Sequence, residues 1–208
     1  MFTVSVVVAL ILGLGGLWYC YLVVAGKVRP VFAAWIIMTT MLSASFVSYW
    51  YSPKHSVQGN IAHLVSVFST LAITSTILIN GWWKGTLRFA FSALQRNCLL
   101  AAACIGFLWY VSANATIANV LMQGVMVIGY TPLVVKLWKT KPGDADGESL
   151  VTWSGVAIGS GVGMFNALAT HEPLAVVYVV RGVATAGLTV FLIGKIRFQN
   201  SRRRDASP

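Results

Sequence analysis

The chain has 208 residues, of which 57% are hydrophobic and 10% are charged, and its formal net charge at pH 7 is +10. A soluble domain carries roughly 25% charged residues, so this composition excludes an ordinary soluble protein. A membrane-spanning helix needs about 20 apolar residues, and about seven such helices with short loops would use the whole chain.

Seven apolar stretches follow one another, and they predict an all-α membrane protein with seven transmembrane helices. The expected spans are about 3–25, 31–50, 60–79, 97–112, 115–138, 150–169 and 173–194. The first is uncharged and too long for a signal peptide, so we expect it to be retained. The fourth is the shortest, and its start is open back to about Leu87. The basic tail from Lys195 is predicted to be disordered.

The lysines and arginines gather on one side of this predicted bundle. With seven spans, thirteen of the fifteen cations fall on one side, Lys54 falls alone on the other, and Arg181 lies inside the seventh span. Cationic loops stay on the cytoplasmic side. The N-terminus is therefore expected outside and the C-terminus inside a cell membrane, which we expect to be a bacterial inner membrane. The charge thus indicates topology, and we expect no nucleic-acid partner. The acidic turn 144–148 is expected to be solvated.

The two halves of the chain resemble each other as three-span units. Trp35 aligns with Trp153, and both units begin outside, so one extra span must join them. Two apolar hairpins can also align by chance. The predicted organisation is a first repeat over 1–80, a basic loop with a linker helix over 81–114, a second repeat over 115–194 and a basic cytoplasmic tail over 195–208.

The second half also resembles a PQ-loop motif. Pro132 lies near the inner end of the fifth span, a basic and polar turn follows, and Ser149 opens the sixth span, although Leu133 stands where the motif has Gln. This motif is typical of the SWEET and PQ-loop transporter superfamily, which has parallel repeats in a 3+1+3 layout. PnuC-type vitamin transporters and the ER retention-signal receptors have a similar layout. The resemblance implies a substrate site between the repeats, with Trp35 and Trp153 as the tryptophan pair of a SWEET pocket.

Arg181 is the one charged residue in the interior of the predicted spans, since Lys136 lies two residues from the inner end of the fifth span. It lies eight residues after Pro173, about 12 Å along the helix, where a cation is costly in lipid. SWEET pockets carry Asn on this span, so Arg181 argues against a sugar. Three interpretations are open: a cavity residue that orients an anion, a cation that reaches the outer headgroups, or a structural hydrogen-bonding hub. Tyr178 shares its face and is a further candidate site residue.

Other polar residues form stripes on their helices. Asn119, Gln123 and Tyr130 share one face of the fifth span, which predicts either cavity lining or hydrogen bonds between helices. Asn166 continues a glycine stripe that predicts close packing, and it is a candidate ligand contact. His63 on the third span is a candidate for proton coupling or a structural hydrogen-bonding residue.

Pro132 removes the helical donor of the Ile128 carbonyl, which predicts a hinge or a purely structural kink. The sequence lacks a nucleophile–base set, a cofactor motif and a metal motif, so we expect no enzyme, no cofactor and no metal. The favoured function is transport of a small polar or anionic solute by alternating access between the repeats. The alternative is a non-transporting seven-span receptor or assembly factor. The expected partners are a small solute and the lipid bilayer, and a homo-oligomer is left open.

Overall fold

The computed structural model describes residues 2–51, 55–86, 91–112, 114–141 and 147–205. These residues form seven helices and no strand, which confirms the prediction of an all-α protein. The helices are α1 (Phe2–Val24), α2 (Phe32–Trp50), α3 (Ile61–Trp83), α4 (Ala93–Ser112), α5 (Ala115–Lys139), α6 (Leu150–Ala169) and α7 (Pro173–Asp205).

Five of the described helices, namely α1, α2, α3, α5 and α7, are long and apolar enough to cross a membrane. This finding supports a multi-pass membrane protein. Helix α6 has 20 residues, among them glycines, hydroxyl residues and Asn166, and it is not one of these five helices. In α4 the apolar stretch Ala93–Leu108 is shorter than these five helices. Length and composition therefore support five spans where the sequence predicts seven.

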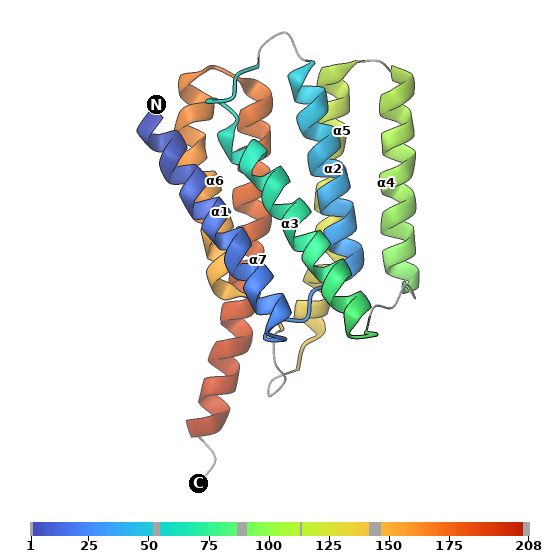
Figure 1. The fold of residues 1–208 in the computed structure, drawn as a ribbon, viewed down its shortest axis with the longest axis vertical. Helices are drawn as coiled ribbons and strands as arrows, with labels where there is room; N and C mark the ends of the chain where they lie inside the picture. The colour runs from blue at the N-terminus through green and yellow to red at the C-terminus, as the bar shows by residue number, and fades with distance from the viewer. Residues whose placement is uncertain (1, 52–54, 87–90, 113, 142–146, 206–208) are drawn as a thin grey trace.

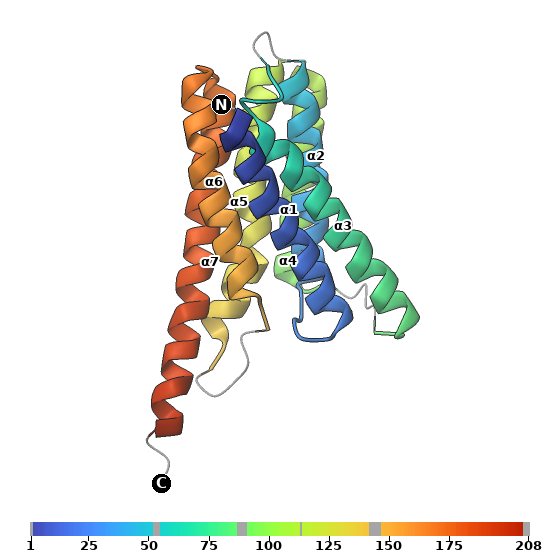
Figure 2. The ribbon, with the colours of Figure 1, turned by 60° about the vertical axis from the view of Figure 1, so that its left-hand side comes forward.

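The helices form one bundle in which successive helices run in opposite directions (Figures 1 and 2). Helix α3 packs against both α1 and α2, and α7 packs against both α5 and α6. These two groups of three helices meet where α1 packs on α6 and where α2 packs on α5. Helix α4 lies at one edge of the bundle, against α5 and α2 (Figure 1).

One end of the bundle carries most of the cations, and we call it the basic end. Helices α1, α3, α5 and α7 run toward it (Figure 1). Gly26 after α1 and Gly85 after α3 have φ angles of 68° and 61°, a region that glycine enters without steric cost. The described cations in the loops and terminal turns at this end are Lys27, Arg29, Lys84, Arg96, Lys136, Lys139, Lys141, Lys195, Arg197, Arg202, Arg203 and Arg204. Lys54 and Arg88 lie outside the described residues.

Two predictions about the ends of helices are wrong. The tail from Lys195 continues α7 as far as Asp205, and its last turns extend beyond the rest of the bundle (Figure 2). The prediction of a solvated acidic turn before α6 is wrong for Glu148, which is only 4% exposed, and residues 144–146 of that turn lie outside the described residues. Glu172, directly before α7, is buried as well.

The glycines of α6 allow it to lie close to the first group of helices. A Cβ atom at Gly159 would lie 2.7 Å from Leu12 Cδ2, and one at Gly163 would lie 3.1 Å from Ala62 Cβ. Side chains at these positions would push α6 away from α1 and α3. This packing agrees with the close approach that the glycine stripe predicts.

Candidate functional site

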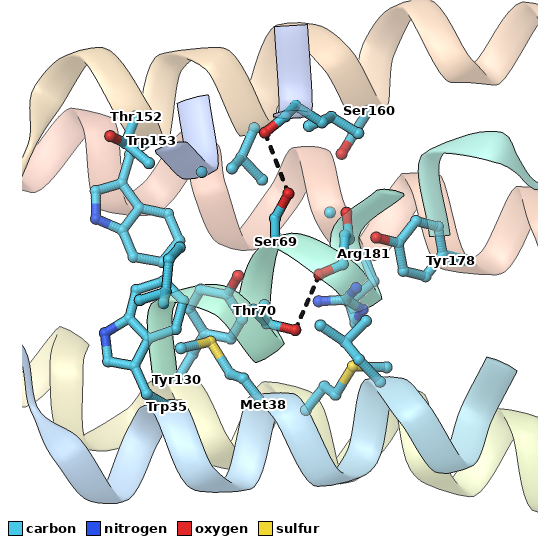
Figure 3. A pocket seen from close by; sticks show the side chains of 18 residues that line it. Trp35, Met38, Ser69, Thr70, Tyr130, Thr152, Trp153, Ser160, Tyr178 and Arg181 are labelled. Atoms are coloured by element: carbon cyan, nitrogen blue, oxygen red, sulfur yellow. Dashed lines mark hydrogen bonds between the residues drawn. The ribbon is translucent and has the colours of Figure 1, made fainter. Parts of the chain in front are cut away.

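A cavity lies between the two groups of helices, and all six helices of these groups contribute to its wall (Figure 3). Its volume is about 50 Å³, counting only the space that the centre of a water molecule can occupy. By this measure one water needs about 10–15 Å³. The cavity therefore has room for a few waters or for one small solute.

Among the described residues that line this cavity, Arg181 from α7 provides the one charged group. Its Nε donates a hydrogen bond to Gln123 Oε1 at 2.7 Å. The guanidinium carbon lies 5.0 Å from the centroid of the Tyr178 ring, a favourable arrangement of a cation over an aromatic face. The guanidinium is therefore held toward the protein interior by a neutral amide and a ring.

Aromatic side chains form the opposite end of the cavity. The ring centroids of Trp35 and Trp153 are 6.0 Å apart, and Tyr130 meets Trp153 edge-on at 5.6 Å. Figure 3 shows these three rings at one end, with Arg181 and Tyr178 at the other. The cavity thus has an aromatic end and a cationic end.

Glu148 lies behind the aromatic end, toward the basic end of the bundle. Its carboxylate accepts hydrogen bonds from the Tyr19 hydroxyl at 2.9 Å and from Trp153 Nε1 at 3.4 Å, and it pairs with Lys136 Nζ at 3.0 Å. Burial raises the pKa of the Glu148 carboxyl above its ordinary value of 4.5, and the positive charge of Lys136 opposes this rise. These contacts join α1 of the first group to α5 and α6 of the second.

Glu172 makes a comparable connection at the other end of the bundle. Its carboxylate accepts hydrogen bonds from the Tyr49 hydroxyl and from Ser56 Oγ, the latter at 2.7 Å. The backbone N–H of Ser56 also donates to the Tyr49 hydroxyl at 2.7 Å. A buried glutamate and a tyrosine therefore tie the two groups of helices together at each end.

Two of the predicted site residues are buried outside the cavity wall. Asn119 Nδ2 donates to the backbone carbonyl of Ser45 at 3.0 Å. Asn166 Nδ2 donates to Ser5 Oγ, also at 3.0 Å. The first bond joins α5 to α2 and the second joins α6 to α1. In this structure both amides therefore make hydrogen bonds between helices.

Gln123 and His63 lie behind residues of the cavity wall. Gln123 Nε2 donates to Ser45 Oγ at 2.8 Å while its oxygen holds Arg181. His63 stacks on Tyr178 with ring centroids 4.2 Å apart. Because a carbonyl only accepts, the 3.0 Å contact with Leu42 O requires a proton on His63 Nε2.

The His63 Nδ1 atom is then the acceptor for Asn60 Nδ2 at 3.2 Å. Both ring nitrogens of His63 are thus engaged within the protein. Pro132 is buried within α5, which is helical on both sides of it from Ala115 to Lys139. Its role as a hinge stays a prediction.

The structure adds two site residues that the sequence does not indicate, Glu148 and Tyr19. They are 129 residues apart, and neither has a local pattern that indicates the other.

Comparisons of the chain with models of protein families, with curated proteins and with solved structures find no match. The function must therefore be argued from the cavity and its surroundings.

Proposed function

We propose that the protein is a membrane transporter that moves a small polar or anionic solute by alternating access between α1–α3 and α5–α7. The proposal is carried by a cavity that six helices enclose and in whose wall, as far as the structure describes the chain, Arg181 is the one charged group. A cation at membrane depth is costly. An anionic solute would compensate for this cost each time it bound.

The proposal includes α4 and α6 as membrane-crossing helices, which gives seven spans in a 3+1+3 arrangement similar to that of SWEET and PQ-loop transporters. The packing supports it, because the third helix of each group packs against the first two. The contact of α1 with α6 also corresponds to the contact of α5 with α2, as expected for two copies related by a two-fold rotation. Parallel repeats of this kind hold their substrate at the repeat interface.

The proposed orientation has the basic end in the cytoplasm, since lysine and arginine are retained there. The N-terminus would then face outside, and the membrane would be a bacterial inner membrane. In this orientation, opening of the cavity to the cytoplasm would separate Tyr19 from Glu148. Opening to the outside would separate Tyr49 from Glu172. Both contacts are present here, as expected for a closed intermediate with a small cavity.

The small cavity volume also favours one alternative. A receptor or assembly factor that binds a small ligand without moving it needs no larger opening. This alternative predicts saturable binding in liposomes without flux.

The two functions are separated by osmotic swelling of proteoliposomes after rapid mixing with polyols, amino acids or carboxylates. We expect the wild-type protein to accelerate swelling with one class of solute. R181Q should lower this rate at least about tenfold, because a charge-assisted hydrogen bond contributes about 1.5–3 kcal/mol. K195Q is the matched control, since Lys195 lies over the Trp138 ring, away from the cavity. Unchanged flux in R181Q would remove Arg181 from the mechanism, and binding without flux would favour the receptor.

A further inference from the structure

We infer that the cavity accepts a compact organic monoanion, a short-chain monocarboxylate with an apolar tail, whose carboxylate lies at Arg181 and whose tail points toward Trp35 and Trp153. This inference rests on the proposed function, because it names the class of solute that the transporter would carry.

The charges of the cavity wall indicate one negative charge on the ligand. Of the described residues in the wall, Arg181 is the one cation and none carries a carboxylate. A second negative charge on the ligand would have no partner, and the ammonium group of an amino acid would have none either. Buried charges of either sign are unfavourable without a partner.

The geometry of Arg181 favours a carboxylate as the charged group. The hydrogen bond to Gln123 uses Nε, so the two terminal nitrogens can meet the two carboxylate oxygens in the planar, bidentate way that arginine favours. The guanidinium carbon also lies over the Tyr178 ring, 5.0 Å from its centroid. A ligand therefore meets a preoriented partner.

Ser160 provides a further polar group at the cationic end. This side chain is only 2% exposed and lines the cavity. A Cβ atom at Gly182 would lie 2.5 Å from Ser160 Oγ, so glycine next to Arg181 leaves room for this hydroxyl. Figure 3 shows Ser160 on the same side of the cavity as Arg181 and Tyr178. Its O–H can donate to a carboxylate.

The rest of the wall indicates an apolar part of the ligand. Six of the eighteen lining residues have aliphatic or thioether side chains, namely Leu12, Met38, Leu42, Ile73, Met126 and Val156, and two more are tryptophans. The Ser69, Thr70 and Thr152 hydroxyls of the wall already donate to other groups of the protein. A sugar or polyol would therefore lose more hydrogen bonds to water here than this wall could replace. The volume of about 50 Å³ limits the tail to a few carbon atoms.

The test is the thermal stability of the purified full-length protein in detergent, titrated at constant ionic strength with sodium formate, acetate, propionate, butyrate and hexanoate. Butyramide, butylamine and sodium succinate serve as neutral, cationic and dianionic probes. We expect saturable stabilisation by monocarboxylates with an optimum chain length, and none by the three other probes. In R181Q the apparent affinity should fall about 10- to 100-fold, while K195Q should retain it.

A second variant tests the position of the tail and does not depend on the folding of R181Q. Met38 lines the cavity between its two ends, so M38A should shift the optimum by one or two carbons toward longer chains. The inference is overturned if amides or dianions stabilise as well as monocarboxylates, or if the optimum stays the same in a folded M38A.

The failure of this inference and the failure of the proposed function give different results. If Arg181-dependent flux is found for polyols or amino acids but not for monocarboxylates, the solute class is wrong and transport stands. If monocarboxylates bind with the expected dependence on Arg181 and Met38 but no solute crosses, the site stands and transport is wrong.

Discussion

Replacing Glu148 tests how the basic end of the bundle is held closed. In E148A the Tyr19 hydroxyl and the Trp153 indole N–H lose their shared acceptor, and these side chains are 0% and 2% exposed. A buried donor without a partner costs about 1–3 kcal/mol. Loss of the ion pair with Lys136 adds little to this free-energy cost, because the Lys136 side chain is 28% exposed and water screens its charge. We expect the free energy of unfolding to fall by about 2–4 kcal/mol.

E148Q separates the hydrogen bonds of Glu148 from its charge. The amide oxygen can still accept from Tyr19, so E148Q should lie within about 1 kcal/mol of the wild type at neutral pH. Burial raises the pKa of the Glu148 carboxyl in the folded protein. Its contribution to stability is therefore complete below its ordinary value of 4.5 and is lost as the pH rises through the folded-state pKa. Raising the pH should lower the stability of the wild type relative to E148Q.

The assay is the melting temperature of the three proteins in one detergent between pH 4 and pH 8. E148A should melt several degrees below the wild type, since about 1 kcal/mol corresponds to roughly 2–4 °C in a chain of this length. Y19F removes a donor that lowers the pKa of the Glu148 carboxyl, so Y19F should lose more stability than the wild type as the pH rises. Two results would refute this account of Glu148: a melting temperature of E148A equal to that of the wild type, or a melting temperature of the wild type that increases relative to that of E148Q as the pH rises.

Three further predictions concern packing, capping and the predicted site. G159A should lower the free energy of unfolding by about 1–3 kcal/mol through overpacking, because the new Cβ would lie 2.7 Å from Leu12 Cδ2. At Gly161 a new Cβ would have nothing within 4 Å, so G161A should raise the free energy of unfolding by up to about 1 kcal/mol. Equal melting temperatures of the two variants would contradict this prediction. S149A should lower the free energy of unfolding by about 1 kcal/mol, because the Ser149 hydroxyl accepts a hydrogen bond from the backbone N–H of Thr152 at the start of α6. Circular dichroism should then show that helix is lost at a lower temperature than in the wild type. N119A should lower the melting temperature but leave the affinity for butyrate unchanged, because Asn119 donates a hydrogen bond to Ser45 of α2 and does not line the cavity. A weaker affinity for butyrate would show that Asn119 belongs to the site.

The positions of the helices could be predicted because long apolar runs are separated by charged, Gly- and Pro-containing turns. Their ends were less predictable where no such residue stops the helix. After Gly194 the chain continues with residues such as Lys195, Arg197 and Gln199, which favour helix, and α7 continues with them. A basic composition alone does not distinguish a disordered tail from a solvated helix.

The candidate site was predictable in part. The isolated charge of Arg181 and the paired tryptophans pointed to residues that do line the cavity. Helical spacing also indicated that Asn119 faces protein, but it does not reveal that Ser45 on another helix accepts its hydrogen bond. The contacts of Glu148 could not be predicted for the same reason, because its partners lie on α1, α5 and α6 and come together only when these helices pack.

The central claim is that one cavity opens in turn to both sides of a membrane. The most direct measurement is the accessibility of Cys introduced by S160C, in a chain whose Cys20, Cys98 and Cys104 are replaced by alanine. The single thiol is treated with a membrane-impermeant reagent in right-side-out and in inside-out vesicles. We expect modification from both sides, slowed by butyrate in each case. A folded protein whose thiol reacts from one side only, or from neither side, would contradict alternating access.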